Sequence, residues 1–185
     1  MEKLLLRIAF FGGLIAACAA TGRAQANPPE GELFGGAASV WSHGLTTYQT
    51  GGAEVSFTGN INRFAGVDMD FGEFSLKPQN PPAYANHYLL LFGPHFTYRA
   101  NPYLNPFAHV LLGLTRGVQA ADFTETGRTA FVAGFGGGLD VKVVRFLWVR
   151  LIQVDYLHES FPNDGQNNLR LSAGLVIRFG SVGRR

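Results

Sequence analysis

The stretch Asn167–Gly180, NNLRLSAGLVIRFG, decides the fold because its apolar side chains recur at every second position. The apolar parity consists of Leu169, Leu171, Ala173, Leu175, Ile177 and Phe179. The other parity carries Arg170, Ser172, Gly174 and Arg178, with Val176 as an apolar exception. A period of two residues predicts a strand with one apolar and one polar face. The rest of the chain must then show what covers the apolar face.

The same alternation recurs along most of the chain and predicts eight strands. We place them at Glu32–Trp41, Gly52–Ile61, Phe64–Ser75, His87–Arg99, Pro106–Val118, Thr129–Val143, Leu147–His158 and Asn168–Phe179. Most are long, whereas strands of globular proteins average about 5 to 6 residues and a tilted strand that crosses a bilayer needs about 9 to 11. The lengths therefore favour an all-β fold built from membrane-crossing strands.

Short and long connections alternate between these strands. The short ones lie near residues 62–63, 101–105 and 144–146, and the long ones include LKPQNPPAYAN, QAADFTETG and ESFPNDGQN. Bacterial outer-membrane barrels have short periplasmic turns and longer external loops. A bilayer also forces the sheet to close, because an open edge would leave backbone groups unpaired in hydrocarbon. We therefore predict an eight-stranded antiparallel up-and-down transmembrane β-barrel.

The apolar parity of such a barrel should face lipid, with aromatic residues near the strand ends. The candidates for these aromatic girdles are Phe57, Tyr88, Tyr98, Phe131, Trp148, Tyr156 and Phe179.

Two positions on the strands are exceptional. Pro94 lacks a ladder donor and predicts a local bulge. Arg150 shares the lipid-facing parity of its strand, and we expect its head group to reach the interface.

Side chains fill the lumen of a barrel with only eight strands, so the charged residues of the inner parity must pair with one another. We predict an internal ionic lattice rather than a catalytic cluster. Its members are Glu54, Asp68, Asp70, Arg99, Asp140, Lys142, Asp155, Arg170 and Arg178.

Composition and the N-terminus indicate export. Only 15% of the residues are charged, against about 25% in an average soluble protein, and the net charge of +2 has no basic run typical of nucleic-acid binding. Residues 1–26 combine Lys3 and Arg7, an apolar core and Ala24-Gln25-Ala26, the pattern of a cleaved signal peptide. The barrel domain would then span residues 27–185. Alternatively, the sequence before Cys18 resembles a lipoprotein box.

The chain resembles the small OmpA-like and OmpX-like outer-membrane barrels in the phrases LFGPHFTYRANPYLNPFAHVLLG, FGGGLDVKVV, RLIQVDYL and NNLRLSAGLVIRFG. Ser172-x-Gly174-x-x-Ile177-x-Phe179 is similar to their C-terminal assembly signal, although GSVGRR follows it here. The resemblance implies a monomer in the bacterial outer membrane, with membrane lipid and the barrel-assembly machinery as partners and no cofactor. It implies a structural or adhesive role, or marginal permeation, with the external loops as the interaction surface.

Two other functions remain open at this point. The first is a lipid A deacylase, because those barrels carry a His-x-Ser that His158-Glu159-Ser160 resembles, with Glu159 or Asp164 as the acid. Here Phe161 replaces the usual following Asn. The second is a soluble lipocalin-like carrier, whose apolar side chains would point inward.

No metal site is expected from histidine spacing. The histidines are His43, His87, His95, His109 and His158, and no two are as close as zinc ligands usually are. His95 and His109 fall on the inner parity, where we expect hydrogen-bonded lumen residues.

The first prediction concerns the N-terminus. Signal cleavage after Ala26 should make Asn27 the first residue of the mature protein and remove Cys18, which mass spectrometry of protein from a membrane fraction would detect. A radioactive fatty acid that labels the wild type but not Cys18→Ser would instead establish lipidation.

Overall fold

A computed structural model describes residues 28–43, 48–76, 84–121, 124–161 and 164–182. The predicted signal peptide, Cys18 and Asn27 lie outside this range. The eight strands are β1 (Gly31–His43), β2 (Tyr48–Asn60), β3 (Ala65–Leu76), β4 (Tyr84–Thr97), β5 (Leu104–Ala121), β6 (Thr124–Lys142), β7 (Leu147–Phe161) and β8 (Asp164–Phe179). Among the described residues, no helix is long and apolar enough to cross a membrane.

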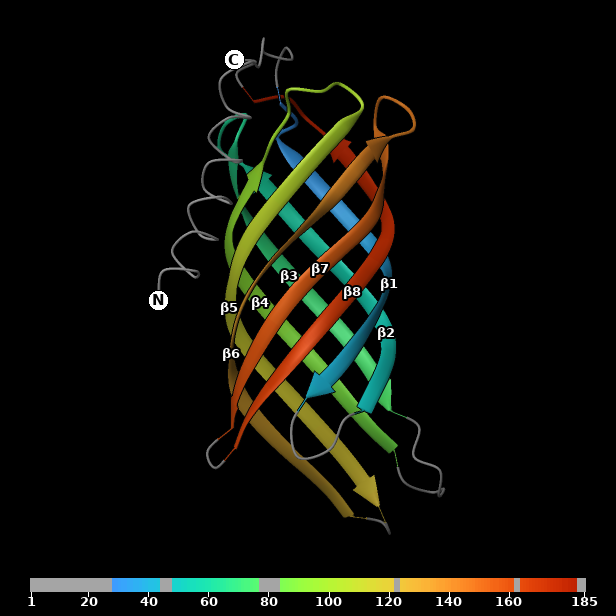
Figure 1. Ribbon diagram of the computed structural model, residues 1–185, viewed down its shortest axis with the longest axis vertical. Coiled ribbons are helices and arrows are strands. Elements are labelled where there is room, and N and C mark those ends of the chain that lie inside the picture. The colour runs from blue at the N-terminus through green and yellow to red at the C-terminus, as the bar shows by residue number, and fades with distance from the viewer. Residues whose placement is uncertain (1–27, 44–47, 77–83, 122–123, 162–163, 183–185) are drawn as a thin grey trace, which may run out of the picture.

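The strands form one closed barrel in chain order (Figure 1). Each strand pairs antiparallel with the next, and β8 closes the sheet by pairing with β1 from Gly31 opposite Phe179 to His43 opposite Asn167. The predicted fold class is therefore confirmed. The alternating parity of each strand places one set of side chains outside and the other in the lumen.

The two ends of the barrel differ. The short turns at residues 61–64, 98–103 and 143–146 lie at one end, together with the described chain ends, which we call the turn end (Figure 1). The far ends of the strand pairs β1–β2, β3–β4, β5–β6 and β7–β8 form the opposite end, the hairpin end. At the turn end, the amide of Val182 donates to the carbonyl of Pro28 at 2.9 Å, so both described ends of the chain are tied together.

The prediction of long loops is wrong for two of the connections. The β5–β6 ladder continues to Ala121 opposite Thr124, and the β7–β8 ladder continues to Phe161 opposite Asp164. QAADFTETG and ESFPNDGQN are therefore largely strand. Polar composition suggested loops, but a two-stranded ribbon satisfies its backbone groups through the ladder whether its side chains are polar or apolar.

The outer surface of the barrel wall is apolar. Many large side chains with an outward parity are exposed, from 37% at Val154 to 63% at Phe135, whereas Glu54 and Arg170 on the inner parity have no exposed surface. A lipocalin has the reverse arrangement. The soluble-carrier alternative is therefore wrong.

A β-bulge in β7 reverses the side-chain parity of that strand. Leu151 and Ile152 are consecutive, yet both are exposed, at 55% and 49%, and the pairing with β6 and β8 shifts register at this point. The extra residue turns Arg150 and Trp148 into the lumen, where they are 2% and 4% exposed. The expectations that Arg150 reaches an interface and that Trp148 belongs to a girdle are therefore wrong, because parity was counted through the bulge.

The bulge expected at Pro94 is absent. Pairing between β4 and β5 stops after Phe92 opposite Leu112 and resumes in the same register with His95 opposite His109. A two-residue gap in the ladder thus accommodates the missing donor of Pro94, whose ring points outward.

The second prediction tests the bulge. Deletion of Leu151 should prevent folding, because it restores continuous parity and drives Arg150 out of the lumen, leaving its partners unpaired. Leu151→Ala is the matched control: it keeps the extra residue and removes only exposed methyl groups, so it should fold. Electrophoretic mobility without heating measures the folded fraction, and a folded deletion variant would contradict the assignment.

Candidate functional site in the barrel lumen

The first lumen layer, at the turn end, is an ionic cluster around Glu32. Arg178 donates from Nε to Glu32 Oε2 at 2.7 Å and from Nη2 to Asp140 Oδ2 at 3.1 Å. Arg99 donates to the other oxygen of Glu32 and, at 2.9 Å, to the amide oxygen of Asn60. The Arg178 guanidinium also lies 3.8 Å from the ring centroid of Trp148. Two strands that are distant in sequence, β1 and β8, are thereby joined.

Arg150 forms the next layer. Its Nε donates to Asp140 Oδ1 at 2.9 Å and its Nη1 to Gln153 Oε1 at 2.6 Å. Its guanidinium carbon lies 4.4 Å from the Phe34 ring centroid and 4.0 Å from that of Phe107, so the cation is in contact with two aromatic rings.

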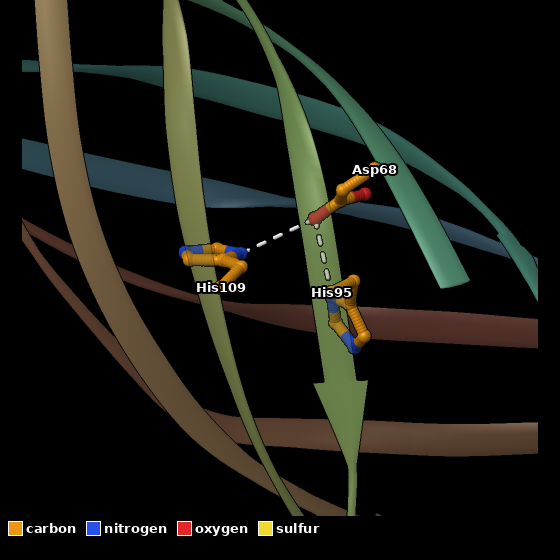
Figure 2. Close-up of side chains that lie close together, drawn as sticks. All are labelled: Asp68, His95 and His109. Carbon is orange, nitrogen blue, oxygen red and sulfur yellow. Dashed lines mark hydrogen bonds and ion pairs between the residues drawn. The ribbon is translucent and has the colours of Figure 1, made fainter. Parts of the chain in front are cut away.

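Asp68, His95 and His109 lie together in the lumen, in the turn-end half of β3, β4 and β5 (Figure 2). Nδ1 of His95 is 3.3 Å, and Nδ1 of His109 3.2 Å, from the same oxygen, Asp68 Oδ2. The hydroxyl of Thr58 donates to the other oxygen, Asp68 Oδ1, at 2.9 Å. The three side chains are at most 3% exposed. Both histidines therefore lie in the lumen with hydrogen-bond partners, as their parity predicted.

Arg170 holds three carboxylates beside the histidine cluster. Its Nη1 and Nη2 bind Asp70 Oδ1 and Oδ2 at 2.8 and 3.0 Å, a bidentate arrangement, and its Nε donates to Asp155 Oδ2 at 2.9 Å. Glu54 Oε2 lies 3.4 Å from Nε, and Ser172 donates to that oxygen. This guanidinium thus links β8 with β2, β3 and β7.

An apolar plug closes the lumen between these ionic layers and the hairpin end. Its side chains are at most 7% exposed and belong to Ala38, Val40, Phe74, Leu89, Leu91, Leu111, Val132 and Leu157. We expected the inner parity to be polar, and this expectation is wrong for the plug. The reason is that packed side chains fill a narrow lumen and exclude water from it, so an inward side chain can be apolar if it fits.

Beyond the plug, Glu159 lies in the lumen near the hairpin end. It accepts a hydrogen bond from Asn168 Nδ2 at 2.7 Å, and its Oε2 lies 3.4 Å from His87 Nε2. His87 also bonds to the hydroxyl of Thr115. This small polar group covers the plug from the hairpin side.

Among the side chains that the structure describes, the deacylase-like residues do not form a catalytic triad. His158 and Ser160 are exposed on the outer face of β7, and Glu159 between them points to the opposite face. The partner of His158 Nδ1 is Asn167 Oδ1, at 2.8 Å. Asp164, the other proposed acid, has a side chain outside the described set. A hydrolase of this type needs an acid that orients the imidazole, and Glu159 cannot do so from inside the barrel.

Eight of the nine residues predicted for the ionic lattice are buried in the lumen, and Lys142 is half exposed at the turn end, with Nζ 6.0 Å from the Tyr103 ring centroid. The lattice has further members that sequence reasoning missed, namely Glu32, Arg150 and Glu159. Glu32 shares the inward parity of its strand with Phe34 and could have been found by counting. Arg150 could not be found in this way, because the alternation of apolar and polar residues in the sequence gives no sign of the bulge.

The four residues of the predicted assembly signal lie on both faces of β8. Ser172 is in the lumen, and Gly174 approaches the backbone of Gly35 and Gly36 so closely that no Cβ would fit. Ile177 and Phe179 point outward and are 45% and 47% exposed. Their role in assembly stays a prediction.

The third prediction concerns Arg170. Arg170→Met should lower the free energy of unfolding by about 3–5 kcal/mol, because it leaves buried carboxylates without a cation. Adding Asp70→Asn should restore part of this loss by removing one of the unpaired charges. Arg116→Met, at an exposed position, should have little effect. Urea unfolding in lipid vesicles gives these energies, and equal effects at both arginines would contradict the predicted importance of the ion pairs.

Comparisons with known proteins identify the fold through structure alone. No protein-family model matches the chain, and no curated protein matches it either. Neisserial surface protein A, from Neisseria, superposes with a TM-score of 0.67 at 15% identity, covering 81% of this chain and 97% of the other.

Two further solved structures agree. Ail, the attachment invasion locus protein of Yersinia pestis, has a TM-score of 0.56 at 16% identity, covering 80% of this chain and 99% of Ail. OprG, an outer-membrane protein of Pseudomonas aeruginosa, has a TM-score of 0.54 at 10% identity, covering 84% of this chain and 98% of OprG. The chain therefore has the fold of the small eight-stranded outer-membrane β-barrels.

Proposed function

We propose that this protein is an integral protein of the bacterial outer membrane, with a closed lumen and a structural or adhesive role. The observation that carries the proposal is the inversion of polarity: apolar side chains cover the outside of the barrel, and paired charges fill its inside. Exposure of this apolar outer surface to water would be unfavourable, whereas contact with the hydrocarbon of a bilayer is favourable. The fold shared with outer-membrane proteins supports the same location.

The apolar surface has boundaries at both ends, as a bilayer requires. Towards the hairpin end, outward positions become polar, at Glu73, Asn86, Arg116, Thr129, His158 and Asn167. Tyr88 and Tyr156 lie just inside this boundary, where aromatic side chains meet lipid headgroups. At the turn end, Arg63 and Arg145 are exposed in two of the turns. The turn end would face the periplasm and the hairpin end the medium, as in other barrels of this type.

The interior argues against a pore. The apolar plug spans the lumen, and the layers beside it consist of ion pairs whose arginines are almost fully buried. Solute passage would require a continuous water-filled path through the lumen. The separation of Glu159 from His158 and Ser160 likewise argues against hydrolysis of lipid A.

We propose that the barrel-assembly machinery inserts this protein as a monomer. Ile177 and Phe179 on the outer face of β8 would be available to that machinery before β8 pairs with β1. No cofactor is part of the proposal.

The hairpin end is the proposed interaction surface, and an acidic saccharide is the ligand class that two exposed arginines there favour. Arg116 and Arg128 are exposed near the hairpin end of β5 and β6, Arg116 on the outward parity and Arg128, which pairs with Gly117, on the inward parity at the mouth of the lumen. Among the neighbours in fold, the Yersinia protein is named for attachment and has also been solved with a heparin analogue, sucrose octasulfate. The sulfates of such a ligand would pair with the two guanidinium groups.

The fourth prediction tests location and adhesion together. Intact cells that express the protein should bind heparin beads, and Arg116→Gln with Arg128→Gln should weaken retention so that lower salt releases the cells. Arg63→Gln with Arg145→Gln is the matched control: it removes the same charge from the turn end, which would lie inside the cell envelope. Equal loss in both double variants, with equal surface expression, would reject the orientation, and no change in either would reject the acidic-saccharide ligand.

A further inference from the structure

We propose that Asp68, His95 and His109 form a binding site for a divalent transition-metal ion of the zinc class inside the lumen. The ligand atoms would be Asp68 Oδ2 and the Nδ1 atoms of both histidines, which point toward one another from three adjacent strands (Figure 2). These three atoms all lie within 4.8 Å of one another. Imidazole nitrogen and carboxylate oxygen are ligands that zinc accepts together.

The distances in the cluster suit the ligands of a metal ion as well as they suit long hydrogen bonds. The Nδ1 atoms of His95 and His109 lie 3.3 and 3.2 Å from Asp68 Oδ2. Charge-assisted N–H···O bonds are usually about 2.7–2.9 Å long. Two ligands of a tetrahedral zinc ion, each about 2.0–2.1 Å from the metal, lie about 3.3 Å apart. The two N···O spacings therefore match those of two ligands on one tetrahedral ion, and the two Nδ1 atoms lie within 4.8 Å of each other.

Each ligand is held on its far side by a second group. Nε2 of His109 lies 2.8 Å from Asp155 Oδ1, Nε2 of His95 lies 3.0 Å from the hydroxyl of Thr97, and Thr58 occupies the distal oxygen of Asp68. Histidines that bind metals usually bond through the other ring nitrogen to a carboxylate or another polar group, which fixes the ring and its tautomer. The cluster already has this outer arrangement.

The partners of His109 are compatible with such an ion. Both of its ring nitrogens face carboxylate oxygens, from Asp68 and Asp155. Without a metal, only an imidazolium with an N–H on each nitrogen can donate to both oxygens. A metal ion at Nδ1 would take the place of one of these protons, while Nε2 keeps its N–H toward Asp155.

The charges of the lumen also call for a cation. The buried acids among the described residues are Glu32, Glu54, Asp68, Asp70, Asp140, Asp155 and Glu159. The buried arginines in the same range are Arg99, Arg150, Arg170 and Arg178, three fewer. A divalent ion at the cluster would add two positive charges beside Asp68 and close to Asp155. Buried charges without partners are strongly unfavourable.

The ion would enter during folding. Phe107 stacks on the His95 ring at 5.0 Å between centroids on the turn side, and the apolar plug lies on the hairpin side. Metal added to the folded barrel should therefore exchange slowly, which fixes the design of the experiment.

The fifth prediction is tested with the untagged full chain carrying Cys18→Ser, which removes the cysteine thiol as a competing ligand. The chain is refolded from urea into detergent with Zn²⁺ or with Co²⁺, and free metal is removed. Elemental analysis should find about one zinc per folded barrel, and the cobalt protein should show the intense visible absorption of tetrahedral coordination. In His95→Gln and His109→Gln, bound metal should fall at least about tenfold.

His158→Gln is the matched control, because it removes an exposed histidine from the outer face of β7 and should bind metal like the parent. Mobility without heating shows which variants fold, and only folded protein is compared. The parent protein alone decides the matter if the variants fail to fold: a folded parent without zinc overturns the proposal. Imidazole nitrogen resonances that show His109 doubly protonated after refolding with zinc would overturn it as well.

Discussion

The cost of burying charge in a narrow lumen controls most of this structure. Eight strands enclose a space that side chains fill, so a carboxylate such as Glu54 cannot be hydrated and must meet a cation. Arg170 meets this demand by binding acids from three other strands. The strands must also leave space for these buried charged groups. At Gly136, for example, a Cβ would collide with the carboxylate of Asp155 and with backbone atoms. The ion pairs therefore restrict this wall position to glycine.

The β7 bulge is a second consequence of the same demand. Without it, Arg150 would point out of the barrel, and Asp140 would keep only its contact with Arg178. With it, the guanidinium lies between two phenylalanine rings and bonds to Gln153. A local irregularity of the backbone therefore places the cation that connects the turn-end cluster to the middle of the lumen.

The strand alternation was sufficient to predict the closed eight-stranded barrel and the inward position of Asp68, Asp70 and Arg170, because a parity repeated over long strands is a strong local signal. It failed where the signal is not local. The bulge that moves Arg150, the apolar plug and the extended β5–β6 ladder depend on packing between strands. The histidine cluster escaped notice for the same reason: Asp68 is 27 residues from His95 and 41 from His109, and only the register of β3, β4 and β5 brings them together.

The closure of β8 on β1 has a consequence for biogenesis. Arg178 binds Glu32 across 146 residues of sequence, so the pair cannot form until the chain is complete. Until then, two strand edges and several of the buried acids lack their partners. The barrel therefore closes only when the complete chain is present. A chain truncated during synthesis would retain open strand edges that proteases can recognise.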